Sequence, residues 1–247
     1  MNIKIFVLSM VMLIPILEYG QTPVNKVIPV NSGQKISMHF DYPELVRIST
    51  WDKTEISIQG TVSINEGEND DAFELLTSSS GNTISIKNEI KNMKDLPQRI
   101  TLRDGAQKIV FRNKEELKKY KETHGLANDN RMSYGFEMEI ILEIKVPRNV
   151  ETTVEAEYGI VEIKDYSGPL TVNATYGGVD ANLTERSIGE ITATTNYGEI
   201  YSDLDTKLTG DASRQGDFRT YVSAKPGTVP KYNFDSEYGN VYLRKAK

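Results

Sequence analysis

The sequence of 247 residues contains no cysteine and only two histidines, His39 and His124. The absence of cysteine excludes disulfide bonds, thiolate nucleophiles and Cys/His metal clusters. Two histidines so far apart in the sequence indicate no metal site, and the serine hydrolase, phosphate-loop and dinucleotide-binding fingerprints are missing. We therefore expect no metal and no cofactor, and a fold stabilised by apolar packing and backbone hydrogen bonds.

A surplus of positive charge is also missing. The chain has 29 Lys and Arg against 35 Asp and Glu, a net charge of −6, and both signs are scattered along it. No basic stripe is present to neutralise phosphates, so nucleic acid is excluded as an expected partner. The length suffices for one large β domain or two small ones.

Only one long apolar run is present, at the N-terminus. Lys4 precedes the run, which covers residues 5–17, and the chain then becomes polar. The run is too short to cross a membrane, so it predicts a signal peptide over residues 1–20, cleaved after Gly20; a buried core helix is the alternative. The remaining chain, 21–247, has no second run of membrane-spanning length. We expect export to the periplasm or the cell surface.

Residues 21–146 alternate between apolar and polar side chains with a period of two, which is typical of half-buried β-strands. Such alternation occurs over residues 36–40, 46–50, 56–64 and 84–86, and clusters of Asn, Asp, Ser and Gly separate the segments. The longest example places six apolar residues on one face: Phe136, Met138, Ile140, Leu142, Ile144 and Val146. These patterns predict N-terminal strands.

A highly charged segment, about 91–133, interrupts this alternation. Within it, residues 113–124 predict a short helix with Asn113 as the N-cap and an apolar stripe of Leu117 and Tyr120. We interpret the segment as an insertion, either a solvated cover or a partner-binding arm. The acidic loop at 66–71 lacks the ordered spacing of a calcium loop and is expected to be a solvated hairpin tip.

Residues 147–247 carry an internal repeat marked by Tyr-Gly. The tyrosines are Tyr158, Tyr176, Tyr197 and Tyr238, and Gln215-Gly216 takes the place of one further pair, giving spacings of 18, 21, 18 and 23 residues. The position two residues after each glycine is apolar, occupied by Val161, Val179, Ile200, Phe218 and Val241. Before each tyrosine, every second residue is expected on the same face as these apolar residues. The residues of this series next to the corner are small.

Each unit therefore consists of a strand, a Tyr-Gly corner, a second strand and a variable loop. A unit of about 20 residues cannot bury its apolar face alone, so the units are expected to stack, with successive strands pairing in parallel. The predicted fold is all-β: a β-solenoid, resembling a parallel β-helix or β-roll, with N-terminal strands and one short helical insertion. Each glycine is expected at positive φ or where neighbouring coils approach closely.

Two groups are candidate binding residues, and no residue is assigned a catalytic role. The four tyrosines should lie above one another along the stack. Facing outward, they could bind sugar rings or a partner protein; facing inward, they would pack the corners, which their phase favours. The second group is the mixed-charge part of the fourth unit, which could bind a glycan, perform acid/base chemistry or be an exposed coil: Asp211, Arg214, Gln215, Asp217 and Arg219.

Three features together carry a family resemblance: the export signal, the Tyr-Gly repeats, and the strand-like run from Leu45 to Trp51 followed by residues 53–58. With them, the chain resembles a family of adhesins of unknown function from Bacteroidetes envelopes, related to the auto-transporter adhesin head group. The resemblance covers most of residues 21–247 except about 91–133. It implies a β-helical or β-roll fold outside the cytoplasm and supplies no catalytic residues.

Three functions remain open. The leading hypothesis is a non-catalytic exported envelope protein, an adhesin or a binding or structural module that contacts a glycan or another envelope protein. The alternatives are a polysaccharide-active enzyme using Asp211 and Asp217, and a periplasmic component of envelope-stress signalling whose insertion docks a membrane partner. The sequence predicts neither the ligand nor the oligomeric state.

Overall fold

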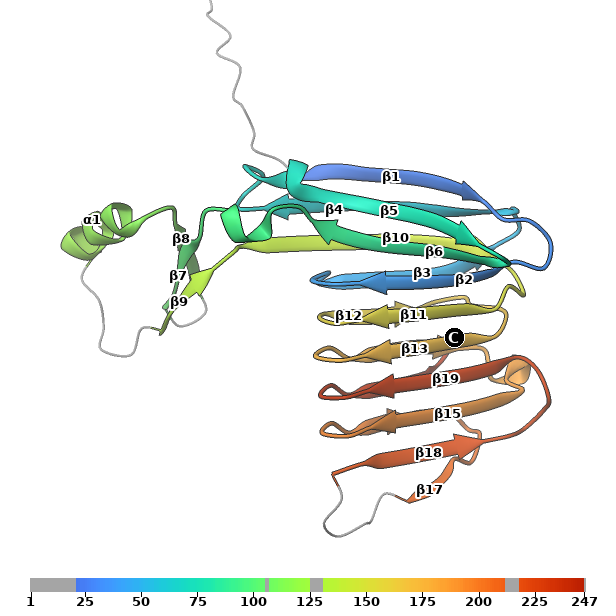
Figure 1. The fold of residues 1–247 in the computed structure, drawn as a ribbon. Helices are drawn as coiled ribbons and strands as arrows, with labels where there is room; N and C mark the ends of the chain where they lie inside the picture. Colours follow the sequence, from blue (N-terminus) through green and yellow to red (C-terminus); the bar gives the residue numbers. More distant parts are fainter. Residues whose placement is uncertain (1–20, 105–106, 125–130, 212–217, 247) are drawn as a thin grey trace, which may run out of the picture.

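The computed structural model describes residues 21–246 except 105–106, 125–130 and 212–217. The predicted signal peptide, residues 1–20, lies outside the described residues. The described part is mostly β-strand, arranged in sheets of eight, nine and three strands, with one α-helix (Figure 1). The all-β prediction is confirmed.

The two large sheets contain strands from both halves of the chain. The eight-stranded sheet contains, in spatial order, β1 (Thr22–Pro29), β4 (Glu55–Ile64), β10 (Met138–Pro147), β3 (Leu45–Trp51), β12 (Ile160–Ile163), β14 (Val179–Leu183), β20 (Val241–Lys245) and β16 (Ile200–Ser202). The nine-stranded sheet contains β17 (Thr209–Asp211), β18 (Thr220–Ala224), β15 (Glu190–Thr195), β19 (Lys231–Ser236), β13 (Leu170–Ala174), β11 (Thr152–Ala156), β2 (Lys35–Phe40), β6 (Thr83–Ile90) and β5 (Phe73–Ser80).

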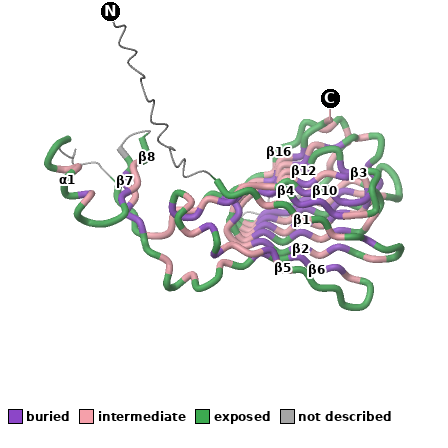
Figure 2. The backbone as a smooth tube through the Cα atoms, turned by 90° about the horizontal axis from the view of Figure 1, so that it is seen from above, coloured by how far each residue is buried: buried purple, intermediate pink, exposed green. Residues whose placement is uncertain are grey.

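The inward-facing residues of both sheets form one continuous apolar core. Along each strand, buried residues alternate with partly exposed ones, as a strand period of two requires. Phe40, Ile144 and Phe234, for example, have 0 to 1% of their surface exposed. Figure 2 shows the buried residues concentrated in the stacked strands. The strands predicted from alternation at residues 36–40, 46–50, 56–64, 84–86 and 136–146 are therefore present.

Five strand pairs share one plan, in which the first strand belongs to the nine-stranded sheet, a turn follows, and the second strand belongs to the eight-stranded sheet. The pairs are β2–β3, β11–β12, β13–β14, β15–β16 and β19–β20. Neighbouring pairs join in parallel, so that Val154 lies opposite Val172 and Val161 opposite Val179. The first pair turns at Tyr42, which precedes proline and was missed by the Tyr-Gly pattern.

The units do not stack in sequence order. Strand β19 lies between β13 and β15, and β20 lies between β14 and β16, so the last pair is inserted between the pairs β13–β14 and β15–β16 (Figure 1). The expectation that every successive unit would pair with the one before it was wrong. Beyond β15, the antiparallel strands β18 and β17 end the nine-stranded sheet.

The glycines of the Tyr-Gly corners are required mainly because neighbouring backbones approach closely. A Cβ on Gly177 would lie 1.4 Å from the carbonyl oxygen of Gly159, and one on Gly239 would lie 1.9 Å from that of Gly177. Gly159 also has a positive φ of 77°. Of the two reasons expected from the sequence, close approach therefore applies to the stack and positive φ to this one corner.

The predicted insertion forms an arm, residues 99–135, that projects from the stack (Figure 1). It contains β7 (Arg99–Asp104), β8 (Gln107–Phe111), α1 (Lys114–His124) and β9 (Arg131–Gly135), with the antiparallel order β8-β7-β9. The helix prediction is confirmed: Asn113 Oδ1 accepts hydrogen bonds from the backbone N–H groups of Glu115 and Glu116, both 3.0 Å long. The small sheet was not predicted. Ile100, Leu102, Phe111 and Leu117 form its own core.

The acidic loop that precedes β5 is not a solvated tip. Asp70 is buried, and its carboxylate accepts hydrogen bonds from the N–H groups of Ile64 (2.6 Å) and Thr22 (3.2 Å). Glu68 pairs with two residues of the arm, Arg99 at 2.5 Å and Arg112 at 2.6 Å. The loop therefore fixes both the edge of the eight-stranded sheet and the base of the arm.

Candidate binding surface

Five tyrosines and one phenylalanine from successive turns of the stack lie in one line. We call them the aromatic strip, in spatial order Tyr42, Tyr158, Tyr176, Tyr238, Tyr197 and Phe218. Neighbouring ring centroids are 5.0 to 5.5 Å apart and the planes are inclined by 6 to 29°. The four predicted tyrosines are thus brought together, and the structure adds a ring at each end.

Five of the six rings of the aromatic strip face solvent, and Tyr42 is partly buried. The exposed fractions of Tyr158, Tyr176, Tyr238 and Tyr197 are 40, 54, 50 and 57%, and that of Phe218 is 75%. The inward corner packing favoured by the sequence phase was therefore wrong. The reason is that each strand ends two residues before its tyrosine, so the alternation that fixes inward and outward positions does not extend into the turn.

Stacking determines which part of each ring a ligand can reach. Because each inner ring has a neighbour on both faces, its edge and its hydroxyl group are the accessible parts. A sugar ring packs against the face of an aromatic ring, where the CH groups meet the electron-rich π surface. The inner rings offer no such face, so the strip is better suited to the side chains of a protein than to stacked sugars.

Carboxylates accompany the aromatic strip. Asp41, Glu157 and Glu237 directly precede Tyr42, Tyr158 and Tyr238 in the sequence. Loss of solvation, followed by the charge of Glu157, raises the pKa of Tyr158. Loss of solvation also raises the pKa of Tyr238, with a smaller contribution from Glu237. These phenols therefore remain protonated hydrogen-bond donors at neutral pH, beside negative charge.

The mixed-charge group of the fourth unit is not assembled into a site by the described residues. Arg214, Gln215 and Asp217 lie outside them, and of Asp211 only the backbone in β17 is described. Arg219 is exposed. Burial raises the pKa of Asp235, and the charge of Arg219 opposes this shift. Phe218, the apolar residue two positions after Gly216, is the terminal ring of the aromatic strip.

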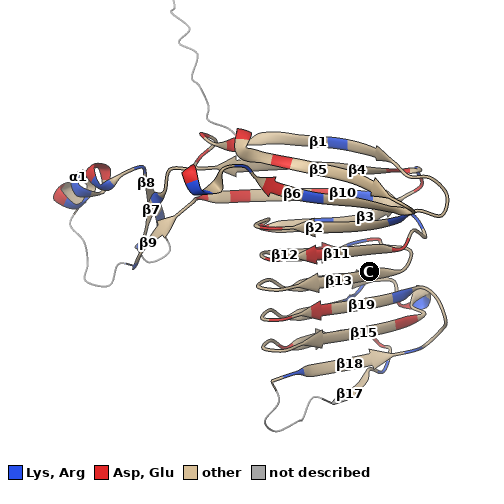
Figure 3. Cartoon of the chain, in the orientation of Figure 1, with Lys and Arg blue, Asp and Glu red and all other residues tan. Residues whose placement is uncertain are grey.

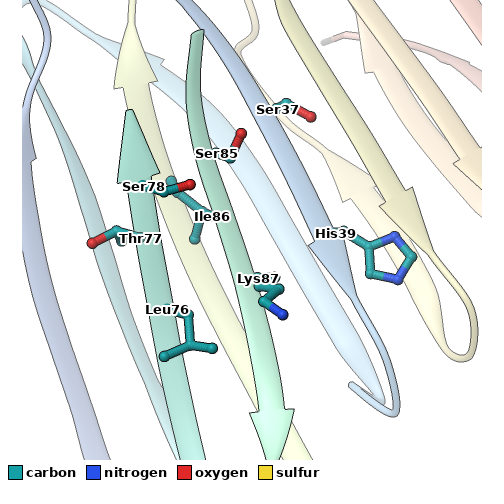
Figure 4. Close-up of a pocket in the computed structure, with 8 residues that line it drawn as sticks. All are labelled: Ser37, His39, Leu76, Thr77, Ser78, Ser85, Ile86 and Lys87. Atoms are coloured by element: carbon teal, nitrogen blue, oxygen red, sulfur yellow. The ribbon is translucent and has the colours of Figure 1, made fainter. Parts of the chain in front are cut away.

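A second feature lies on the outer face of the nine-stranded sheet and was not predicted. A shallow hollow of ≈ 440 Å³ spans strands β2, β6 and β5 (Figure 4). It is lined by Ser37, His39, Leu76, Thr77, Ser78, Ser85, Ile86 and Lys87. His39, at its border, is held by Glu155 and Asp41, each 3.0 Å from a ring nitrogen.

Metal binding and membrane insertion can be assessed only for the described residues. Across 21–104, 107–124, 131–211 and 218–246, no three His, Asp or Glu side chains are grouped so that they could hold a metal ion. Over the same ranges, no helix has the length and apolar character needed to cross a membrane.

The chain matches no family model and no curated protein. Two solved structures are similar to it. One is a "putative cell adhesion protein" from Clostridium sporogenes, 10% identical, with a TM-score of 0.49 over 92% of this chain and 100% of that chain. The other is a "putative adhesin" from Bacteroides fragilis, 11% identical, with a TM-score of 0.21 over 92% of this chain and 98% of that chain. At these values, neither similarity carries an argument about function.

Proposed function

We propose that this chain is an exported, non-catalytic binding module of the cell envelope, of the adhesin type, which contacts a partner protein through the aromatic strip. The observation that carries the proposal is the line of six stacked aromatic rings, five of which are exposed. Tyrosine contributes a large contact area with few rotatable bonds, and it is enriched in protein interfaces and in their energetic hot spots. A rigid β stack holds the rings in place before binding, which lowers the entropic cost of association.

The charges beside the strip define the chemistry of the partner. The accessible parts are ring edges and phenolic hydroxyls, with Asp41, Glu157 and Glu237 next to them. A surface that combines apolar side chains with Lys or Arg complements this pattern, because carboxylates attract and hydrogen-bond cationic groups. We therefore expect a basic, partly apolar partner segment.

Export and the absence of catalysis are parts of the same proposal. The N-terminal signal pattern and the adhesin resemblance support them, as does the stacking of the strand pairs, which presents long, regular surfaces. Titratable groups with shifted pKa values, such as Glu162, Glu185 and Lys245, lie in ion pairs near the surface. The hydrogen bond from the backbone N–H of Thr206 is the main cause that lowers the pKa of Glu185, and ion pairs account for the shifts of Glu162 and Lys245.

Photo-crosslinking in intact cells tests the contact. We expect p-benzoylphenylalanine in place of Tyr176 or Tyr238 to give a discrete adduct with a partner protein. Tyr242, which alternates outward on β20, provides the matched control and should give none. The double variant Glu157→Lys and Glu237→Lys should abolish the adducts. Failure of both strip positions to crosslink would refute the proposal, and an adduct of twice the chain's mass would replace the partner protein with a second copy.

The N-terminus of the protein purified from cells tests export. Removal of the signal peptide predicts a mature chain that begins at Gln21 and fractionates with the envelope. A protein that retains Met1 and stays with the cytoplasmic fraction would contradict this part of the proposal. Protease accessibility before and after permeabilisation of the outer membrane then distinguishes the cell surface from the periplasm.

The arm favours a second candidate function, docking to a membrane partner in envelope-stress signalling. The register places Met132 opposite Leu102 and Tyr134 opposite Ile100, on the face that carries the small core. Even so, Met132 is 43% and Tyr134 59% exposed. If this function is correct, replacing residues 99–135 with a Gly-Ser linker should remove a co-purifying partner and leave crosslinking at the strip unchanged.

The enzyme alternative depends on the side chains of Asp211 and Asp217, which are not described, and it is not proposed.

A further inference from the structure

Every strand of the nine-stranded sheet contributes one Ser, Thr or Asn to a single row across the outer face. The strand register aligns them in the order Ser78, Ser85, Ser37, Thr153, Thr171, Asn233, Thr192, Ser223 and Thr209. We call this the polar row. Because neighbouring strands are about 4.8 Å apart, it presents a hydroxyl or amide group at each such step along the stack.

The position of the polar row on the outer face follows from its neighbours in the strands. Thr153 lies between Thr152 and Val154, both buried, and is itself partly exposed. Thr171 has the same setting between Leu170 and Val172. The members are short side chains with their polar groups directed away from the core, which makes the row a low strip along the face.

Longer charged side chains flank the polar row and neutralise one another. On one side, Lys35 pairs with Glu151 at 2.9 Å and Lys231 with Glu190 at 3.3 Å. On the other side, His39 pairs with Glu155 at 3.0 Å. In Figure 3 the charged residues of β19 lie toward the two ends of the strand, with uncharged residues between them. The row therefore suits an uncharged ligand beside these three pairs, since their charges already have partners.

The hollow provides a second, independent observation. Three members of the polar row, Ser37, Ser78 and Ser85, line the ≈ 440 Å³ hollow at one end of the row, and Leu76 adds an apolar wall (Figure 4). Cross-strand hydrogen bonds explain part of the row, since Thr192 donates to Asn233 Oδ1 at 2.5 Å and Thr209 to the carbonyl oxygen of Ser223 at 3.2 Å. Such cross-strand pairing does not explain why the sheet has a hollow at Ser37, Ser78 and Ser85. The combination of hydroxyls and an apolar wall matches a ligand with hydroxyl groups on a hydrocarbon ring.

We propose that the polar row is a binding site for an extended, uncharged polysaccharide. A Ser or Thr hydroxyl both donates and accepts hydrogen bonds, as sugar hydroxyls do, so the two can pair in either direction. Steps of about 4.8 Å are close to the length of one sugar residue in an extended chain. Many weak contacts along one polymer add to a useful affinity, because each contact after the first is intramolecular. The site is separate from the aromatic strip and does not depend on the proposed partner protein.

Affinity electrophoresis of the mature protein tests this inference. The probes are gels containing a neutral β-glucan, a galactomannan or dextran, with polygalacturonate as the charged comparison. We expect at least one neutral polysaccharide to retard the protein and polygalacturonate not to do so. The double variant Thr153→Val and Thr171→Val, which keeps shape and strand propensity, should bind about tenfold more weakly because two hydroxyls are lost.

The matched control is the double variant Thr153→Ser and Thr171→Ser, which retains both hydroxyls and should bind within about twofold of the wild type. Circular dichroism and thermal unfolding confirm that both variants fold. The inference is overturned if no neutral polysaccharide retards the wild type, or if the Val and Ser variants bind equally. Lys substitution of Glu157 and Glu237 should leave retardation unchanged, which separates this site from the aromatic strip.

Discussion

At the scale of single residues, His39 links two strands through its two carboxylate partners. The hydrogen bond to Glu155 raises the pKa of His39 above 6.5, and Asp41 contributes in the same direction. The raised folded-state pKa means that the charged pair stabilises the fold below about pH 6.5, and that this contribution is lost as the pH rises through the folded-state pKa. The His39 side chain is 51% exposed, so the effect is under about 1 kcal/mol.

We therefore predict that His39→Gln lowers the urea midpoint at about pH 5.5 and has no effect at about pH 9. Urea unfolding of both proteins across this range measures the difference. Ser37→Ala, two residues earlier on the same face of β2, is the control and should show no such pH dependence. A difference between His39→Gln and the wild type that grows with pH would reverse the sign and contradict the assignment.

Glu68 supplies the partner for a buried cation at the base of the arm. The Arg99 side chain is 3% exposed and its guanidinium lies 2.5 Å from Glu68. Removal of the carboxylate leaves a buried positive charge without this partner, so Glu68→Ala should destabilise the base of the arm by about 2 kcal/mol. Hydrogen exchange of β7 and β9 measures this, with exposed Asp71→Ala as the control. Unchanged exchange would show that the ion pair contributes nothing.

The sequence correctly predicted that four of the strip tyrosines lie in one line. The inward orientation that it favoured for them was wrong. Their phase relative to buried Ala156 and Ala174 suggested the core, but both strands end at those alanines. Tyr42 was missed because proline, not glycine, follows it. Phe218 was noted only as the apolar residue two positions after Gly216, and this spacing does not show which way its side chain points.

At the scale of the elements, the corner glycines determine how closely two units can approach. A Cβ on Gly177 would lie 1.4 Å from the Gly159 carbonyl oxygen, and both positions are backbone that cannot move without separating the units. Gly177→Ala should therefore destabilise the protein by more than about 3 kcal/mol. Gly135→Ala, where no atom lies within 4 Å of the added Cβ, is the control and should change stability by less than about 0.5 kcal/mol. Thermal unfolding compares the two, and equal effects would contradict the packing argument.

Strands with a long alternating pattern were predictable, and short charged ones were not. In β7 the inward residues Ile100 and Leu102 alternate with Thr101 and Arg103, but the pattern spans only six residues within a charged segment. The polar row had a usable signal: a Ser, Thr or Asn stands five residues before each turn tyrosine, including Thr171 before Tyr176. Its alignment across nine strands depends on register, which the sequence alone does not provide.

At the scale of the whole molecule, the repeat pattern in the sequence could not predict the spatial order of the units. Each unit presents the same kind of apolar face and the same close-packed corner to its neighbours, so the pattern fits either neighbour equally well. Placing β19 between β13 and β15 makes the last unit pair with strands distant in the sequence. The stability of contacts between residues far apart in the sequence depends on the entropic cost of closing the loop between them, and local propensity does not determine it. Counting repeats in the sequence therefore cannot reveal such contacts.

This order predicts an unusual response to truncation. In a sequentially wound stack, removing the last unit would shorten one end and leave the others paired. Here, a chain that stops at Pro230 lacks β19 and β20, so β13 and β15 lose their common neighbour, as do β14 and β16. We expect β15, β16 and β18 to lose their protection from hydrogen exchange altogether, because a gap in the middle of the stack exposes apolar faces on both sides.

Hydrogen exchange followed by mass spectrometry measures this protection segment by segment. The control removes residues 22–29 instead, because β1 lies at the edge of its sheet and pairs only with β4, so strands β13 and β15 should stay protected. Adding a peptide of residues 231–247 to the truncated chain should restore protection of β15, since the peptide carries both missing strands. If β15 remained protected without residues 231–247, the last unit would be an end cap, and the non-sequential order of the stack would be wrong.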